Sequence, residues 1–472
     1  MARGFLFKKN GNVVIVLTLL VAAAGFLVMN RSNGALGGQP FGGPKLVSVQ
    51  QLPRQFAGME GMMDGMACEW MPASARGSFA AFQEDGGDAP SDAVREAAAQ
   101  RRPVLTMKDT YAGFSAVAVD PTNDEVVMTD ENLFSIRSYD RTVNTPPQAA
   151  LSEPKRIIRG EATDIEFQCS LWVDPANGDI YAVNNDTLGK LVIFSREKRG
   201  NTEPTRFIET PHTTYGIAAY EPANEIMLTI QDDSAVVTYP KTASGKEPPI
   251  RLLQGEKTLL ADPHGITIDP RRDLLYVTNW GSGNRRVPPP GGPKVGTLGR
   301  GNGHPNWPIG RNYQIPGSGY FSPPSITVYP RIARGDVAPS RTIQGPKTQL
   351  NWPTALSVNP ENGEIYVAND PENSILVFAG DANGDVAPIR VLTGPKTTLQ
   401  NPTGVYYDAK NKELWVANFG NHSATVFSPD ADGDTPPLRV IRSGPVGAPA
   451  PMMGNPHTVA YDSKRGEILV AN

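Results

Sequence analysis

Cysteine is scarce in this 472-residue chain, and an excess of basic charge is missing. Its two cysteines, Cys68 and Cys169, cannot build a disulfide framework, and their separation matches no metal-site spacing. Lysine and arginine number 44 against 48 aspartates and glutamates, which gives a net charge of −4. This balance argues against nucleic acid as a partner. The chain also lacks a serine-centred nucleophile elbow, a phosphate-cradling loop and a haem attachment motif.

A long apolar run occurs at the amino terminus. Val13–Met29 carries no charge, follows three basic residues and is just long enough to span a bilayer. We therefore expect residues 1–30 to form an uncleaved signal-anchor helix, and cleavage after Ala35 is the alternative. In both cases the positive-inside bias predicts that the rest of the chain lies outside the cytoplasm, in the periplasm or at the cell surface.

Glycine and proline, in contrast, are abundant, with 47 and 44 residues. Without a collagen period, so much turn chemistry indicates many short strands joined by tight loops. Residues 31–100 are rich in Gly, Ala, Met and Pro and show no sustained period, so we expect a flexible stalk there.

A repeat of about fifty residues fills the chain from residue 101 to residue 472. Its clearest copies, Pro353–Gly394 and Pro402–Gly444, each contain four short apolar or alternating runs separated by Asn-Gly, Asp-Gly or Pro. Four runs predict four antiparallel strands, which we call a to d in chain order. One such sheet cannot bury both of its faces, whereas sheets stacked around an axis can. The sequence therefore predicts an all-β protein, a β-propeller of six to seven four-stranded blades.

The spacing of the repeats locates an insertion and leaves the number of blades open. Strand a ends in successive units at Asp120, Asp174, Tyr220, Asp269, Asn359, Asp408 and Asp462. The step of ninety between the fourth and fifth of these places an insertion at residues 281–324, between strands b and c of blade four. The seventh unit stops at Asn472. Pro103–Thr106 matches a strand d and Lys45–Gln50 is a candidate strand c for it, but we expect this blade to be truncated.

The repeat motifs resemble those of YVTN and NHL β-propellers. Leu274–Asn279 reads LLYVTN, Tyr366–Asn369 and Trp415–Asn418 are close variants, and two units start with Pro-x-Gly-(Ile/Val)-x-x-Asp. The resemblance covers about 370 residues and implies the propeller fold. For function it implies little, because such propellers include surface proteins, sensor domains and a minority of enzymes.

The residues just before each strand a are expected to line the mouth of the central channel. By alignment of the repeats they are Ser115, Cys169, Tyr215, His264, Thr354, Thr403 and His457. Imidazole and thiolate suit zinc or copper. The resemblance to NHL proteins implies zinc, since the amidating lyase of that class binds zinc through channel-mouth histidines. Only His264 and His457 match that placement. We interpret the ring as polar residues capping a wet channel, with zinc or calcium at these two histidines as the alternative.

Polar residues also recur where strand b ends. They are Asp130, Asn184, Asn279, Asn369, Asn418 and Asn472. Gluconolactonase-like propellers hold a divalent cation through a Glu, Asn and Asp set, but Asp130 is the only carboxylate in this series. The repetition predicts a turn role instead, with the side chain bonded to nearby backbone. The acidic loops Asp381–Asp385 and Asp430–Asp434 lack the downstream glutamate of a calcium loop and are interpreted as turns.

The insertion combines basic and aromatic residues and contains no aspartate or glutamate. A b–c loop emerges on the channel-mouth face, and a long loop in a compact fold is usually functional or disordered. We take as candidate recognition residues Arg285, Arg286, Arg300, His304, Trp307, Arg311 and Tyr313. Such side chains suit an anionic glycan or a partner protein, and a functionless surface loop is the alternative.

The sequence identifies neither a substrate nor a catalytic residue, and it favours a binding or scaffold protein over an enzyme. We expect an extracytoplasmic, membrane-tethered propeller that presents the insertion to a protein or glycan of the cell envelope. No cofactor is expected apart from the divalent metal considered above. The alternative function is a metal-dependent hydrolase or lyase, lactonase-like or amidating-lyase-like, with its site at the channel mouth.

Overall fold

The computed structural model describes residues 49–51, 105–107, 110–185, 189–284, 319–450, 459–462 and 467–470. Strands and short 3-10 helices make up the regular structure of these residues, which include no α-helix. Within this part of the chain no helix has the length and apolar character needed to cross a membrane. The predicted anchor, and the predicted stalk except residues 49–51, lie outside the described residues.

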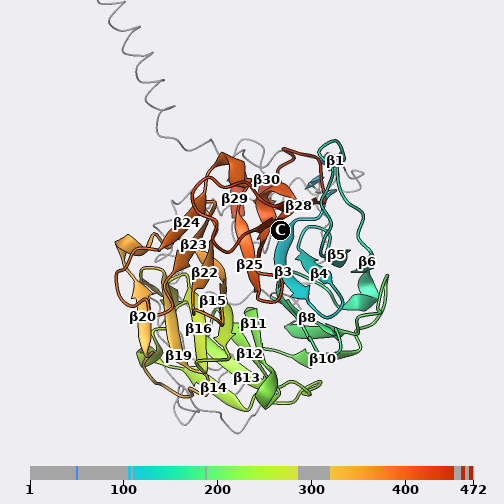
Figure 1. Cartoon of the computed structure of the whole chain (residues 1–472). Coiled ribbons are helices and arrows are strands. Elements are labelled where there is room, and N and C mark those ends of the chain that lie inside the picture. The colour runs from blue at the N-terminus through green and yellow to red at the C-terminus, as the bar shows by residue number, and fades with distance from the viewer. Residues whose placement is uncertain are drawn as a thin grey trace, which may run out of the picture. The chain divides into compact units, whose positions relative to one another are not determined.

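Six four-stranded antiparallel sheets form the blades, and Figure 1 shows them following one another around a centre. The strands of blades one to three are β3 (Phe114–Asp120), β4 (Glu125–Asp130), β5 (Ser135–Asp140), β6 (Arg156–Arg159), β7 (Gln168–Val173), β8 (Ile180–Asn184), β9 (Lys190–Phe194), β10 (Arg206–Glu209), β11 (Thr214–Tyr220), β12 (Glu225–Ile230), β13 (Ala235–Pro240) and β14 (Arg251–Gln254). Those of blades four to six are β15 (Pro263–Asp269), β16 (Leu274–Asn279), β19 (Ser325–Pro330), β20 (Arg341–Gln344), β21 (Pro353–Val358), β22 (Ile365–Asn369), β23 (Ser374–Phe378), β24 (Arg390–Thr393), β25 (Pro402–Asp408), β26 (Glu413–Asn418), β27 (Ser423–Phe427) and β28 (Arg439–Arg442). The predicted strands a to d are therefore confirmed as the four strands of each blade.

The middle strands are apolar on both faces because each blade lies between two others. In blade five, β22 reads IYVAN and β23 reads SILVF, and every residue of both strands is buried. The outer strand β24 reads RVLT and buries only its leucine fully. Each core cluster draws side chains from adjacent blades, as where Tyr181 and Leu191 of blade two pack with Ile226 of blade three. Burial of such a side chain contributes about 1.5–3 kcal/mol.

The ring closes with six blades. The inner strand of blade six, β25, contacts the inner strand of blade one, β3, as every other inner strand contacts the next. Trp415 and Val426 of blade six pack with Val117 and Met128 of blade one in one core cluster. The Thr145 N–H of blade one donates to the Val440 carbonyl of blade six at 2.8 Å. This bond has the same form as those that join the other neighbouring blades, so the closing seam is an ordinary one.

The described strands of the seventh repeat lie outside the six sheets of the ring. Among the described residues, β29 (Val459–Asp462) and β30 (Glu467–Val470) pair with each other, and β1 (Val49–Gln51) pairs with β2 (Leu105–Met107) in a separate sheet. The two amino-terminal segments considered for the seventh unit thus pair with one another. The repeats in the sequence indicate how many segments have a similar strand pattern. The number of blades that close the ring depends on the angle between neighbouring sheets, which the repeat pattern does not specify.

The Pro-x-Gly start of strand a reflects close contact between inner strands. A Cβ atom on Gly265 would lie 2.7 Å from the Cα of Ala355 in the next blade, closer than atoms can approach. At Gly404 the same atom would lie 3.0 Å from the Cα of Ala116. Blades one and five carry alanine at this register, so the ring requires a small residue where its inner strands meet.

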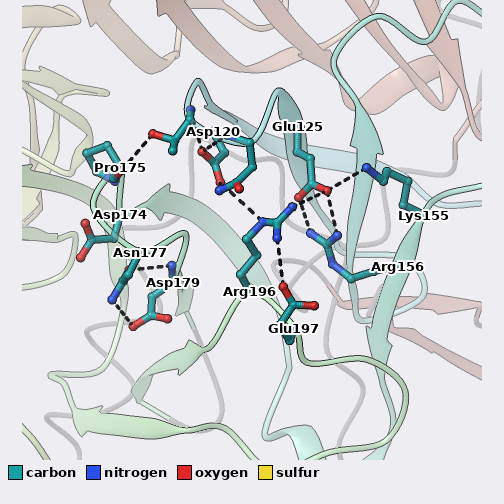
Figure 2. Close-up of polar contacts among 12 residues, drawn as sticks. Asp120, Glu125, Lys155, Arg156, Asp174, Pro175, Asn177, Asp179, Arg196 and Glu197 are labelled. Atoms are coloured by element: carbon teal, nitrogen blue, oxygen red, sulfur yellow. Dashed lines mark hydrogen bonds and ion pairs between the residues drawn. The ribbon is translucent and has the colours of Figure 1, made fainter.

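Charged seams link the blades at the opposite end of the strands from the mouth. Glu125 begins strand b of blade one and is 1 % exposed, and Figure 2 shows Arg156 of its own blade and Arg196 of blade two converging on it. Arg156 binds both of its carboxylate oxygens, at 2.9 and 2.5 Å, and Arg196 binds one at 3.0 Å. Burial alone would raise the pKa of Glu125, but hydrogen bonds from Arg156 and Lys155 hold it at about 2.

The same device recurs around the ring. A glutamate at the start of strand b meets an arginine at the start of strand d in the pairs Glu225–Arg251, Glu364–Arg390 and Glu413–Arg439. In blades two and four, Arg206 and Arg341 bind tyrosine hydroxyls instead. The repetition identifies these residues as part of the scaffold.

The polar residues that end strand b have the predicted backbone role. Asn369 accepts the Asn351 N–H at 2.7 Å and donates to the Gln349 carbonyl at 3.1 Å. Four blades share the acceptor bond to a residue 18 positions earlier, through Asn184, Asn279, Asn369 and Asn418, and Asp130 binds the Gly113 N–H at 2.9 Å. These side chains fasten the d–a connection to the end of strand b. Asn472 lies outside the described residues.

The acidic loops between strands c and d also bind backbone. Asp385 accepts the Lys347 N–H at 2.7 Å, and Asp434 accepts the Lys396 N–H at 2.6 Å. Each of these lysines belongs to a 3-10 helix of the preceding blade, η5 (Pro346–Thr348) or η6 (Pro395–Thr397). The loops therefore cover the outer edge of the neighbouring blade, and the interpretation as turns agrees with these contacts.

The insertion leaves blade four between strands b and c, where it was predicted, because β16 pairs directly with β19. Its described ends form a short hairpin of β17 (Ser282–Asn284) and β18 (Gly319–Phe321). The Ser282 hydroxyl donates to Asp262 at 2.5 Å, which fixes this hairpin beside the start of strand a. Residues 285–318, with all seven candidate recognition residues, lie outside the described residues.

Candidate functional site at the channel mouth

The inner strands of the six blades surround a central channel of about 480 Å³. A β-bulge interrupts the pairing of strands a and b at the same end of every blade, as between Pro263 and Ile266 in blade four. A bulge turns the side chains beside it out of the regular alternation. The six described residues expected just before strand a are the second residues of these strands, next to the bulge at the mouth end of the channel.

The six described residues of the predicted mouth ring divide into two groups. Ser115, Thr354 and Thr403 each donate their hydroxyl to a carbonyl of the next blade, at 2.6, 3.3 and 2.8 Å. Thr354 and Thr403 also line the channel, but their hydroxyls are hydrogen-bonded to the backbone of the neighbouring blade. Cys169 and Tyr215, from blades two and three, line the channel as well. His457 lies outside the described residues.

His264 is fully buried at the mouth and both of its ring nitrogens have partners. Nδ1 lies 3.0 Å from the Asp262 carbonyl, and Nε2 lies 2.7 Å from the Nε2 of Gln231. The Gln231 Oε1 accepts from Asn185, so its NH₂ group faces the histidine and must donate. Nδ1 also lies 3.6 Å from the Oδ1 of Asp262, so the imidazole is held between blade three and the start of strand a in its own blade.

Four rings form a column that begins in the channel. Tyr215 contacts His264 with ring centroids 4.2 Å apart, and His264 stacks on Trp280 at 3.6 Å and 11°. Trp280 stacks in turn on Trp352 at 4.7 Å and 17°. Trp352 is 50 % exposed, so the column ends in an open indole face.

A second ring lies one residue beyond the end of strand b, and sequence reasoning missed it. We call it the mouth collar; its members are Glu131, Asn185, Gln231, Trp280, Asp370 and Phe419. A backbone bond holds five of them, since their N–H groups donate to the carbonyls of Gly113, Phe167, Thr213, Asp262 and Asn401 at 2.9–3.2 Å. Unlike the asparagines before them, the collar residues differ from blade to blade. That variation next to a repeated position is the sequence signal that would have located them.

Two collar residues carry carboxyl groups, and they belong to blades one and five, which blade six separates. The negative charges of Glu131 and Asp370 both raise the pKa of Tyr215, after the larger effect of burial. Tyr215 lines the channel in blade three, so both carboxyls act electrostatically on the same residue of the channel.

Both carboxyls hold a proton more tightly than they would in water. The pKa of Glu131 is raised to about 7; burial is the main cause, a hydrogen bond with Cys169 opposes it, and the charges of Asp130 and Asp370 reinforce it. Burial raises the pKa of Asp370 to about 6, against a hydrogen bond from Asn401. Near neutral pH the pair can both donate and accept protons.

Two polar atoms of the collar are buried without a hydrogen-bond partner. They are Oδ1 of Asp370, whose side chain belongs to a residue only 5 % exposed, and the indole Nε1 of Trp280. Native proteins leave few buried polar atoms unpaired, because each costs about 1–3 kcal/mol. One acceptor and one donor of the collar thus lack a hydrogen-bond partner.

The zinc or calcium site considered from the sequence stays a prediction, because His457 lies outside the described residues. The described residues contain no group of three His, Cys, Asp or Glu side chains placed to hold a metal ion. Both nitrogens of His264 have hydrogen-bond partners, and three members of the ring are hydroxyl residues that bind carbonyls of the next blade. The side chains described at the mouth can take part in hydrogen bonding, aromatic stacking and, through Glu131 and Asp370, proton transfer.

Comparison with known proteins supports the fold and leaves the function open. Residues 332–436 match the family described as SMP-30/Gluconolactonase/LRE-like region. This span runs from the c–d loop of blade four to that of blade six and includes Asp370 but not Glu131. The predicted resemblance to propeller repeat proteins is confirmed at the level of the fold. No curated protein matches the chain.

Among solved structures, 1102 chains match this one. One of them is the Kuenenia stuttgartiensis hydrazine synthase, which is 12 % identical with a TM-score of 0.42. That alignment covers 77 % of this chain and 96 % of the other.

Proposed function

We propose that the chain is a binding module that takes a small polar ligand into the mouth of its propeller channel. The observation that carries the proposal is Asp370, a carboxyl that is almost fully buried and leaves Oδ1 unpaired while sharing the mouth with Glu131. A scaffold gains nothing from such a group, because its burial costs free energy. A ligand that donates a hydrogen bond to Oδ1 supplies the missing partner.

The proposal includes the setting expected from the sequence. The apolar run at Val13–Met29 supports a membrane tether with the propeller outside the cytoplasm. The hairpin that starts the insertion is fixed to Asp262 beside the aromatic column, which supports a role of the insertion at the mouth. A protein or glycan of the cell envelope is the partner class that we propose for this face.

A thermal-shift screen of the full-length chain against a library of polar metabolites tests the binding function. The chain is purified in a polyoxyethylene detergent, which contains no sugar. We expect at least one compound to raise the Tm of the wild type and of the control Glu197→Gln, whose carboxyl is 76 % exposed on the far seam. The same compound should not raise the Tm of Asp370→Leu, although this variant folds. Equal shifts in Asp370→Leu, or no shift with any compound, would contradict the proposal.

A second candidate function is hydrolysis of a sugar lactone or ester. The pKa values near neutrality of Glu131 and Asp370 favour it, as does the match of residues 332–436 to a family whose description includes gluconolactonase. One carboxylate would take a proton from a water molecule while the oxygen of that water attacks the carbonyl carbon of the lactone or ester. The other carboxyl would protonate the leaving alkoxide.

Assays with a panel of aldonolactones at pH 7 distinguish this function from binding. Turnover that is lost in both Glu131→Gln and Asp370→Asn would support hydrolysis. Turnover that persists in both variants, or none in the wild type, would reject it.

A further inference from the structure

We propose that the ligand of the mouth is a neutral saccharide, and that one of its rings stacks on the indole of Trp352. This inference rests on the binding function proposed above and names its ligand class. Three features of Trp352 carry it: its backbone conformation, its place in the aromatic column, and its position beside Asp370.

The backbone at Trp352 does not favour tryptophan. Its φ is 44°, and the equivalent residues of blades three, four and six also have a positive φ, at Thr213, Asp262 and Asn401. Asparagine and aspartate tolerate this left-handed conformation best, after glycine, whereas a bulky side chain there is an outlier. The repeat geometry imposes the conformation, so the tryptophan needs another reason to be present. Strain of this kind is typical of positions with a function.

The aromatic column explains what the indole offers. One face of Trp352 stacks on Trp280, and the buried His264 supports Trp280 from behind. The rings are nearly parallel, and Trp352 is half exposed although Trp280 covers one of its faces, so part of the indole is open to solvent. The result is a rigid flat platform rather than a cage with rings on several sides. The C–H face of a sugar ring fits a single flat aromatic surface.

Polar groups lie where the edges of such a sugar would be. Pro353 pairs with Asn369 across strands a and b, and Trp352 and Asp370 are the residues adjacent to this pair on the mouth side. The unpaired Oδ1 of Asp370 suits a sugar hydroxyl. An acidic sugar would meet the charges of Glu131 and Asp370 and be repelled. A quaternary ammonium ion is better held by rings on several sides, which this column does not provide.

Isothermal titration of the full-length chain with defined probes tests the inference. The probes are cellotetraose, xylotetraose, mannotetraose, maltotetraose and chitotetraose, with tetragalacturonate as the acidic probe and choline as the cationic one. The test variant is Trp352→Asn, which carries the residue that blade six has at this register. The matched control is Leu259→Asn, because Leu259 is also a large exposed apolar residue with a positive φ, 54 % exposed at 58°.

We expect at least one neutral tetrasaccharide to bind the wild type and the control equally, and to bind Trp352→Asn about tenfold more weakly or worse. The Tm of Trp352→Asn should equal or exceed that of the wild type, since the strain is relieved, which separates lost binding from lost folding. Equal saccharide affinity in Trp352→Asn, binding of choline or tetragalacturonate alone, or no binding of any neutral probe would overturn the inference. A non-saccharide ligand found in the metabolite screen and lost in Asp370→Leu would overturn the saccharide while leaving the binding function standing.

Discussion

The charged seams and the channel mouth place carboxyl groups in opposite environments. At the seam, Glu125 is buried among arginine and lysine side chains that hold its pKa at about 2. At the mouth, Glu131 follows strand b by one residue, meets further carboxyls and has a pKa of about 7. Seam residues recur from blade to blade, and collar residues do not. In this ring, repetition accompanies stabilising contacts and variation accompanies groups that cost stability.

The two regions should therefore respond to pH with opposite sign. A carboxyl whose pKa is lowered by folding adds stability above its unfolded pKa, and this is lost as the pH falls through the folded value. The seam glutamates Glu125, Glu225, Glu364 and Glu413 belong to this class. A carboxyl whose pKa is raised by folding costs stability as the pH rises from its unfolded to its folded value. Glu131 and Asp370 belong to this second class.

The largest effect is expected at the seam. Glu125→Gln removes the charge that Arg156 and Arg196 share, and an unpaired buried charge costs about 3–5 kcal/mol. Chemical unfolding of the full-length chain at pH 7 measures the loss. The control Glu197→Gln breaks an ion pair of Arg196 with an exposed carboxylate, and we expect a change below about 0.5 kcal/mol. Equal effects in the two variants would show that the seam is not a stabilising network.

A smaller contrast separates two neighbours in blade five. Asn369→Ala removes the bonds to the Asn351 N–H and the Gln349 carbonyl, and should cost about 1–2 kcal/mol. Asp370→Ala, one residue later, removes a carboxyl with an unpaired oxygen and should leave the Tm equal or higher at pH 8. A comparable loss in both variants would remove the distinction between the end of strand b and the collar.

Much of the fold followed from the sequence, because strand runs and turn residues are local properties. The sequence predicted a strand at Leu274–Asn279, the insertion in blade four, and the backbone role of Asn184 and Asn369. The number of blades was not, since it depends on the angle between sheets, and seven units were counted where six blades close. The roles of Ser115, Thr354 and Thr403 were also hidden. A hydroxyl beside the axis can face the channel or a neighbouring carbonyl, and only the packing of the next blade decides.

The collar was missed for a related reason. Repeat motifs are defined by residues that recur, such as the asparagines that end strand b. The collar residues follow these asparagines by one position and do not recur, so no motif marks them. Glu131 and Asp370 become a pair only when blades one and five are brought around the same channel, far apart as they are in the chain. Trp352 stands just before Pro353, outside the repeat motif. Its stacking with Trp280, which in turn stacks on His264, involves residues of another blade and is not visible in the sequence.

The stability of a double variant at two pH values tests the central claim, that the collar carboxyls are kept at a cost to the fold. Glu131→Gln combined with Asp370→Asn is compared with the wild type by chemical unfolding of the full-length chain. At pH 8 the wild type carries both charges, and we expect the double variant to be more stable by about 2–3 kcal/mol, less than the full linkage value because the mouth opens to solvent. At pH 4.5 both carboxyls of the folded wild type are protonated, and the difference should nearly vanish. A double variant that is less stable than the wild type at pH 8 would contradict the account, because the collar would then be part of the scaffold.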